Sequence, residues 1–152
     1  MTETHASVLQ LRVVVETDDL DRDVAFYRNV LGLTEQAAFE GEGDARVVIL
    51  EAGRATLELA NRAQVAMIDD IEVGRPASPR IRLAFEVTDA DGTTTAAVAA
   101  GATLIAAPVE TPWRSRNARL DDLNGTQLTL FQELEPLDAR TDRPGFGTTT
   151  DR

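Results

Sequence analysis

The sequence predicts an α+β fold built from two related modules, each with the element order βαβββ. The stretch LQLRVVVETDDLDRDVAFYRNVLGL at residues 9–33 has a degenerate counterpart in PRIRLAFEVTDADGTTTAAVAAGATL at residues 79–104. In both, an alternating apolar strand leads into an aspartate-rich helix start and a helix closed by glycine. Arg12 and Arg82 occupy equivalent places in the two stretches. We therefore expect a pseudo-symmetric fold whose function depends on what the two copies present to the space between them.

The first module covers residues 8–60, after an N-terminal extension of residues 1–7. Its first segment alternates apolar and polar residues, which is typical of a strand. Asp18 or Asp19 supplies the side-chain cap of a helix, and Gly32 suits the left-handed residue that often follows a helix end. Glycine-containing connections then favour hairpins. The predicted elements are strands at 8–16, 34–39, 45–51 and 55–60, with the helix between the first two.

The second module covers residues 80–132 and repeats this order with an alanine-rich helix. Residues 61–79 contain Gly74, Pro76 and Pro79 and lack strand alternation, so we expect them to form the inter-module linker. The elements predicted for this module and beyond are strands at 80–87, 103–109, 116–121 and 126–132, a helix from about Ala90 to Ala100, and a flexible C-terminal tail at 133–152.

Composition and charge exclude several classes of protein. The 152 residues contain no cysteine, which excludes thiolate nucleophiles and cysteine-ligated zinc or iron–sulfur centres. His5 is the only histidine, which argues against a multi-histidine metal site within one chain. Lys and Arg number 15 against 26 Asp and Glu, and a net charge of −11 would repel a nucleic acid. No stretch approaches the roughly 20 apolar residues that span a membrane. We expect a cytoplasmic protein with no nucleic-acid or membrane partner.

Four stretches, taken in order, are similar to the vicinal oxygen chelate (VOC) superfamily, which includes glyoxalase I, bleomycin-resistance proteins and extradiol dioxygenases. They are DLDRDVAFYRNVLGL, RATLELA, RLAFEVTD and TPWRSRNARLDDLNGTQLTLFQ. The resemblance implies the glyoxalase/bleomycin resistance/dihydroxybiphenyl dioxygenase fold, in which pseudo-symmetric modules form curved mixed sheets around a central cavity. It also implies a homodimer.

Metal-dependent members of this superfamily place ligands on the first and last strands of each module. Carried over by the resemblance, those positions fall at Arg12, Glu58, Arg82 and Thr129. Arginine offers hydrogen-bond donors and no acceptor, and it keeps its positive charge, so it repels a cation. Glu58 is therefore the only ligand-like position retained. We expect no metal site and no cofactor, with a divalent metal as the alternative.

The residues expected to point inward suggest a pocket for a small molecule. Arg12 and Arg82 would receive an anionic group, while Trp113 and Phe131 would pack against a ring. Alternatively, Glu58 simply neutralises one of the arginines in a former metal site and holds the modules together. The expected ligand-binding residues are Arg12, Glu58, Arg82, Trp113, Thr129 and Phe131; no catalytic residue is assigned.

Two further groups of polar residues have simpler interpretations. Arg114, Arg116 and Arg119 cluster near the mouth of the second module, where we expect mainly solvated charges at a strand edge, with the alternative that one of them reaches the ligand. Asp122 and Asn124 belong to a turn, because the spacing lacks the long loop and terminal glutamate of a calcium-binding EF-hand.

Three function classes fit the sequence. The first, which we favour, is metal-independent binding of a small organic molecule, an antibiotic or metabolite, in the manner of bleomycin-resistance proteins. The second is a glyoxalase-type lyase or isomerase, or an extradiol-type dioxygenase, with non-standard ligands that a partner chain could help to supply. The third is a structural or regulatory dimer with a vestigial cavity.

Overall fold

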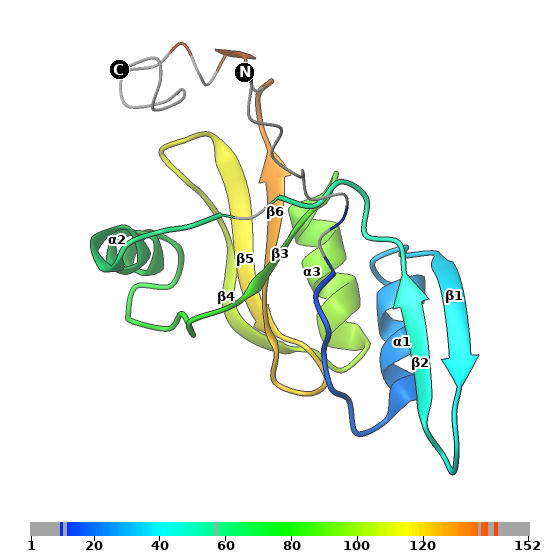
Figure 1. Ribbon diagram of the computed structural model, residues 1–152. Helices are drawn as coiled ribbons and strands as arrows, with labels where there is room; N and C mark the ends of the chain where they lie inside the picture. The colour runs from blue at the N-terminus through cyan, green and yellow to red at the C-terminus, as the bar shows by residue number, and fades with distance from the viewer. Residues whose placement is uncertain (1–9, 11, 57, 137, 140–141, 143–152) are drawn as a thin grey trace, which may run out of the picture. The chain divides into compact units, whose positions relative to one another are not determined.

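The computed structural model describes residues 10, 12–56, 58–136, 138–139 and 142 (Figure 1). The chain divides into two compact units, Met1–Leu59 and Ala60–Arg152. Each unit combines helix with an open sheet, of two strands in the first unit and four in the second. The predicted α+β class, with curved sheets that do not close, is confirmed.

The first unit contains helix α1 (Leu20–Asn29) and a hairpin of strands β1 (Glu35–Glu40) and β2 (Arg46–Leu50). Asp19 caps α1, as expected, by accepting a hydrogen bond from the backbone N–H of Arg22 at 3.1 Å. This contact satisfies one of the four N–H groups that a helix start leaves without an internal partner.

Three further features complete the first unit. Gly32 has a φ of +73°, the left-handed conformation expected after α1. The buried ring of Phe26 meets Tyr27 edge to face at 5.2 Å. An ion pair between Arg46 and Asp21, at 2.6 Å, joins β2 to α1 on the surface.

Two strands predicted for the first module are absent from the residues that the structure describes there. The described residues of segments 12–16 and 55–60 lie outside every strand. Val14 is 84% exposed and Leu59 86% exposed. Because these segments bury no large side chain in the described structure, little offsets the conformational entropy lost by fixing an extended backbone. Within its described residues, this module therefore reads αββ instead of βαβββ.

The second unit forms every element predicted for the second module. Its sheet has the order β3 (Leu83–Glu86), β6 (Gln127–Glu133), β5 (Ser115–Asp121) and β4 (Thr103–Glu110). Strand β3 runs parallel to β6, while the other neighbours are antiparallel. Helix α3 (Ala90–Ala99) lies against one face of this sheet (Figure 1).

The main core lies between this sheet and α3. Leu120 and Leu128 are paired across β5 and β6, and Leu130 lies beside them, all fully or almost fully buried. Ala90 and Ala97 are the buried apolar residues of α3. Their small side chains allow the helix to approach the leucines closely, so this face is held by apolar packing.

Residues 61–79, expected as a linker, contain a helix that the sequence pattern did not predict. Helix α2 spans Arg62–Glu72 and is capped by Asn61, whose side chain accepts from the N–H of Gln64 at 3.0 Å. It lies on the opposite side of the second unit's sheet from α3 (Figure 1). The segment then turns at Gly74, which has a φ of +85°.

Two further expectations concern membrane-spanning helices and the C-terminal tail. Within the described residues, no helix is long and apolar enough to cross a membrane. The expected tail at 133–152 lies mostly outside the described residues.

The turn after α3 generates a stability prediction. Gly101 has a φ of +112°, and a Cβ atom there would lie 2.8 Å from Cδ2 of Leu123. We expect Gly101→Ala to lower the free energy of unfolding by about 1–3 kcal/mol, because it adds backbone strain and a steric clash. At Gly41 the added Cβ would meet Ala45 at an ordinary 3.4 Å, so Gly41→Ala should change stability by less than about 0.5 kcal/mol. Equal losses in urea denaturation would contradict this account.

Candidate functional site

One face of the second unit's sheet carries a buried polar cluster, which we term the Arg119 face. Side chains alternate along β5, so Ala118 and Leu120 face α3 and Arg119 points to the other side, toward α2. The strand register aligns Arg119 with Thr129 of β6. The residues of the Arg119 face are Asn117, Arg119, Gln127, Thr129 and Phe131.

Arg119 is the exception among the three arginines expected to be mainly solvated, because its side chain is 0% exposed. A guanidinium group keeps its proton, so it can be buried only with acidic or strongly accepting partners. The expectation holds for its two neighbours. Arg114 is exposed and pairs with Glu110, and the partly exposed Arg116 pairs with Asp91 of α3.

Two carboxylates from α2 surround the Arg119 guanidinium. Nε donates to Oε2 of Glu72 at 3.0 Å, and Nη2 lies 2.9 Å from the same oxygen. Nη1 donates to Oδ1 of Asp69 at 3.0 Å, to Oε1 of Gln127 at 2.9 Å and to Oγ of Ser78 at 3.2 Å. Asp69 and Glu72 are three positions apart and therefore project from one side of the helix.

Asp69 also fixes the chain that follows α2. Its Oδ2 accepts from the backbone N–H groups of Ala77 and Ser78, each at 2.9 Å, and its Oδ1 accepts from the Ser78 hydroxyl at 2.6 Å. Burial by itself raises the pKa of Asp69. The hydrogen bonds from Ala77, Ser78 and Arg119 outweigh burial and lower the pKa to about 2. Asp69 therefore stays ionised at neutral pH.

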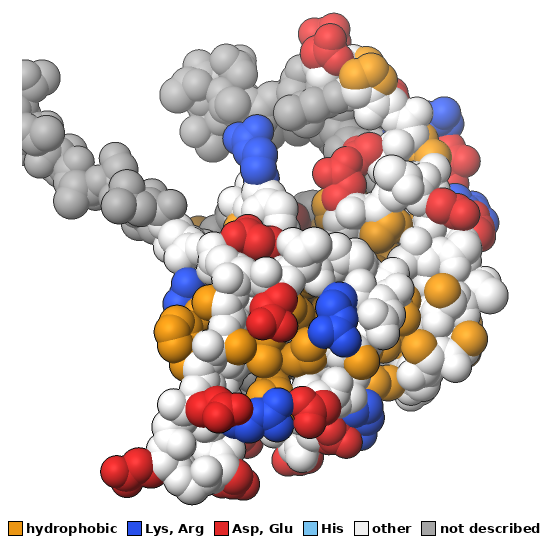
Figure 2. All heavy atoms as spheres, turned by 90° about the vertical axis from the view of Figure 1, so that its right-hand side faces the viewer, with side chains coloured by type: hydrophobic (Ala, Val, Ile, Leu, Met, Phe, Trp, Pro, Cys, Tyr) orange, Lys and Arg blue, Asp and Glu red, His pale blue; other side chains and the backbone are white. Residues whose placement is uncertain are grey.

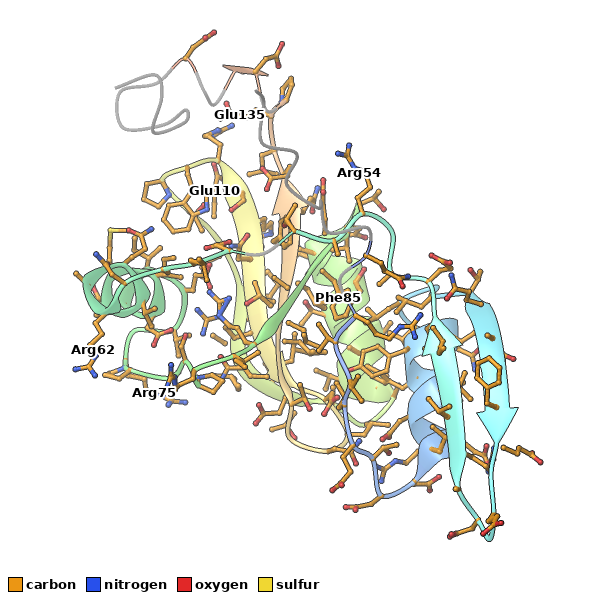
Figure 3. The ribbon with its side chains drawn as sticks, viewed as in Figure 1. Arg54, Arg62, Arg75, Phe85, Glu110 and Glu135 are labelled. Carbon is orange, nitrogen blue, oxygen red and sulfur yellow. The ribbon has the colours of Figure 1, made fainter. Side chains whose placement is uncertain are left out.

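The outer side of α2 and the turn after it carry exposed charges of both signs, including Asp70. Arg62 and Arg75, near the two ends of the helix, are exposed and point away from the sheet (Figure 3). The two buried acidic residues of the helix, Asp69 and Glu72, meet the Arg119 face, where they match the charge of the guanidinium.

Two acceptor atoms on the Arg119 face are not used in the described structure. Asn117 donates through Nδ2 to Oε1 of Glu72 at 2.7 Å, but its Oδ1 has no hydrogen-bond partner among the described residues. Oγ of Thr129 also has none. The two residues are only 6% and 3% exposed. A buried polar atom without a partner is costly, so these atoms mark a place suited to a polar ligand atom or a water molecule.

The structure places four of the predicted ligand-binding residues in the second unit. Thr129 and Phe131 lie on β6 as part of the Arg119 face, and Phe131 is half-buried opposite Asn117. Arg82 directly precedes β3 and is half-buried. Trp113 is half-buried in the turn that joins β4 to β5. Of these four residues, only Thr129 and Phe131 lie on the same strand and on the same face of the sheet.

The remaining two predicted residues belong to the first unit. Arg12 is exposed, lies outside the strands and donates to the side chain of Gln10 at 3.2 Å. Glu58 is exposed and likewise lies outside the strands. A joint site of Arg12, Glu58 and Arg82 therefore stays a prediction.

Sequence reasoning missed the acidic partners of the buried arginine. Asp69 and Glu72 fall in a segment expected to be a linker, and the expected linker has no helix face on which they could meet Arg119. Their three-residue spacing, between the Asn61 cap and Gly74, is the signal that could have revealed α2.

The Arg119 face does not fit a divalent metal ion. A metal there would have to displace the Arg119 guanidinium from the carboxylates of Asp69 and Glu72, and the permanent positive charge would repel it. Thr129 supplies only a neutral hydroxyl. Among the residues that the structure describes, no group of three or more His, Cys, Asp or Glu could hold a metal ion.

Comparison with known proteins agrees with this fold. A family model described as a glyoxalase-like domain matches residues 12–131. No curated protein matches the sequence.

Three solved structures are similar. A glyoxalase/bleomycin resistance protein/dioxygenase family enzyme from Burkholderia phytofirmans is 24% identical, with a TM-score of 0.51 over 78% of this chain and 93% of that one. A glyoxalase family protein from Bacillus cereus is 18% identical, with a TM-score of 0.55 over 86% and 97%. A hypothetical protein from S. aureus is 14% identical, with a TM-score of 0.56 over 84% and 95%.

The pKa of Asp69 generates a prediction about acid stability. Its folded-state pKa of about 2 lies below the ordinary value of 3.8, so the unfolded chain takes up the proton first. Asp69 then contributes roughly 2 kcal/mol of stability above about pH 4, and this contribution is lost as the pH falls toward 2. We expect Asp69→Asn to lose about that much at pH 7 and to flatten the pH dependence between 4 and 2.

The matched control is Asp70→Asn, because Asp70 is exposed on the same helix. Urea denaturation at a series of pH values measures both variants. If Asp70→Asn changed the acid profile as much as Asp69→Asn, a general charge effect would replace the proposed local one.

Proposed function

The chain belongs to the glyoxalase-like domain family, and we propose that it binds a small organic molecule, an antibiotic or a metabolite, without a metal ion. The observation that carries the proposal is the chemistry of the second unit's polar face. Where metal-dependent members of the VOC superfamily would hold a cation, this chain has Thr129, with the buried Arg119 guanidinium aligned beside it. A fold shared with enzymes does not bring their chemistry when the ligating residues are replaced.

The residues around this face suit an organic ligand. Phe131 offers a half-buried aromatic ring on the face itself, and Arg82 supplies a positive charge next to β3. Trp113 offers a second half-buried ring, in the turn at the end of β4. Aromatic rings combined with a few polar groups are the usual lining of small-molecule sites. We include Arg12 and Glu58 of the first unit in the proposed site as its expected second half.

We also propose that the protein acts as a homodimer. The first unit exposes several large apolar side chains, which a second copy would remove from water. They are Val13, Val14, Val15, Phe39, Val47 and Leu59. Figure 2 shows hydrophobic side chains open to solvent among charged ones on the face that it views.

The alternative function is metal-dependent catalysis, either by a lyase or isomerase of the glyoxalase type or by a dioxygenase. It would require Glu58 together with carboxylates from another chain. The exposure of Glu58 leaves it available for such a role, but nothing in the described residues supplies the remaining ligands.

Metal independence is tested by metal analysis. Protein incubated with Zn²⁺, Ni²⁺, Mn²⁺ or Fe²⁺ and then desalted should hold less than stoichiometric metal and show no glyoxalase activity, because arginine cannot ligate a cation. Stoichiometric metal that disappears in Glu58→Ala would support the enzyme alternative instead.

Ligand binding is tested by native mass spectrometry of the purified protein, followed by titration with any molecule that it retains. Binding should quench Trp113 fluorescence, and Arg82→Ala should weaken affinity by ~1.5–3 kcal/mol through loss of a charge-assisted hydrogen bond. The matched control is Arg75→Ala, an exposed arginine that points away from the sheet. A fall in melting temperature with unchanged affinity would assign Arg82 a purely structural role.

A further inference from the structure

We propose that α2 is a displaceable lid on the Arg119 face, and that its acidic side chains occupy Arg119 in place of the carboxylate of an organic acid. This inference rests on the proposed binding function and adds to it the ligand class and the means by which the site is closed. It concerns only the second unit, within which α2, β5 and β6 lie together.

The first support is the way in which the sheet holds Glu72. One carboxylate oxygen accepts from Nδ2 of Asn117 at 2.7 Å, and the other accepts from Nε of Arg119 at 3.0 Å. The amide and the guanidinium therefore donate one hydrogen bond to each oxygen of one carboxylate. A ligand carboxylate in the same place would find both donors already in position.

The second support is the weak apolar attachment of the lid. Ile68 is the only buried hydrophobic side chain of α2, and Met67 beside it is 44% exposed. The other buried residues of the helix are Asp69 and Glu72. Buried ion pairs contribute little net stability, because desolvation offsets most of the attraction. Exchanging Glu72 for an external carboxylate keeps Arg119 paired, so the exchange avoids the large cost of a lone buried charge.

The third support is the pair of unused acceptors next to this carboxylate position. Oδ1 of Asn117 and Oγ of Thr129 are sealed from solvent and have no hydrogen-bond partner among the described residues. A ligand that placed a hydroxyl or amine beside its carboxylate could donate to them. Phe131, opposite Asn117 on β6, could pack against a ring of such a ligand. The chemistry therefore points to an aromatic acid with an adjacent hydrogen-bond donor.

The chain around α2 also suits movement as one piece. Asp69 binds the backbone of Ala77 and Ser78, which ties the helix to the segment after it. Gly74 and the exposed Pro79 lie between that helix and β3. Residues 77–78 are also bonded to the sheet, because the carbonyl of Ala77 accepts from Nε2 of Gln127 at 2.9 Å and the Ser78 hydroxyl accepts from Arg119 at 3.2 Å. Opening the lid therefore breaks these bonds while the helix and residues 77–78 move together about the exposed segment that leads into β3.

The experiment uses salicylate as the probe, because it combines a carboxylate, an adjacent hydroxyl and a ring. Salicylamide, which is neutral, is the matched control ligand. We expect salicylate to bind saturably and to raise the hydrogen-exchange rates of the backbone amides of residues 62–72 by at least about fivefold. Salicylamide should do neither. Salicylate binding that leaves the exchange rates of these amides unchanged would contradict the lid proposal. Equal effects of salicylate and salicylamide would contradict it as well.

Variants test the competition directly. Glu72→Gln removes the competing charge and should tighten salicylate binding at least about fivefold, while Asp70→Asn on the exposed side of the helix should leave it unchanged. Ile68→Ala loosens the lid without changing any charge and should also tighten binding, which provides a test if Glu72→Gln does not fold. Unchanged affinity in the folded variants would show that α2 is a permanent structural element.

The two proposals fail separately. A molecule retained by the wild-type protein, with no change in α2 exchange on its release and no gain from these variants, would keep the binding function and reject the lid. Stoichiometric metal that disappears in Glu58→Ala, together with the expected gains in salicylate affinity, would reject the metal-independent function and keep the lid.

Discussion

The buried guanidinium of Arg119 constrains the rest of the second unit. Arginine stays charged, so a fully buried arginine on a β-strand must be met by acidic groups from another element. Asp69 and Glu72 meet it, and they can do so only because residues 62–72 are helical and lie across the sheet. One side chain on β5 thus explains why the segment before β3 has a defined structure.

The two faces of this sheet are held by different forces. Against α3, the buried residues are mainly leucines and alanines, with Thr94 as the buried polar residue of the helix, and most of the stabilisation comes from apolar surface removed from water. Against α2, hydrogen bonds and ion pairs dominate, and the lost hydration of the charges offsets part of their attraction. Packing therefore determines how α3 lies on the sheet, whereas the pairing of charges determines how α2 lies on it.

Membership of the glyoxalase-like family gives the fold, and the side chains decide what the fold does. In this chain the positions expected for metal ligands carry Arg12 and Arg82, and the Arg119 face adds a third arginine. Guanidinium groups recognise carboxylates and other anions instead of metal ions. On the Arg119 face the anions that this guanidinium meets are the chain's own carboxylates, Asp69 and Glu72.

The sequence by itself determined the elements whose signals are local. Asp19 and Asp89 cap their helices, Gly32 and Gly101 follow them with positive φ, and periodicity located all four strands of the second unit. Arg119 shows the limit of such reasoning. The sequence indicated the place of Arg119 on its strand, but it did not indicate whether that side of the strand faces water or α2. Burial depends on which distant segment covers a residue, and that is decided by packing between elements far apart in the chain. The same holds for the strands expected near Arg12 and Glu58, because a strand needs a neighbour as well as an alternating pattern.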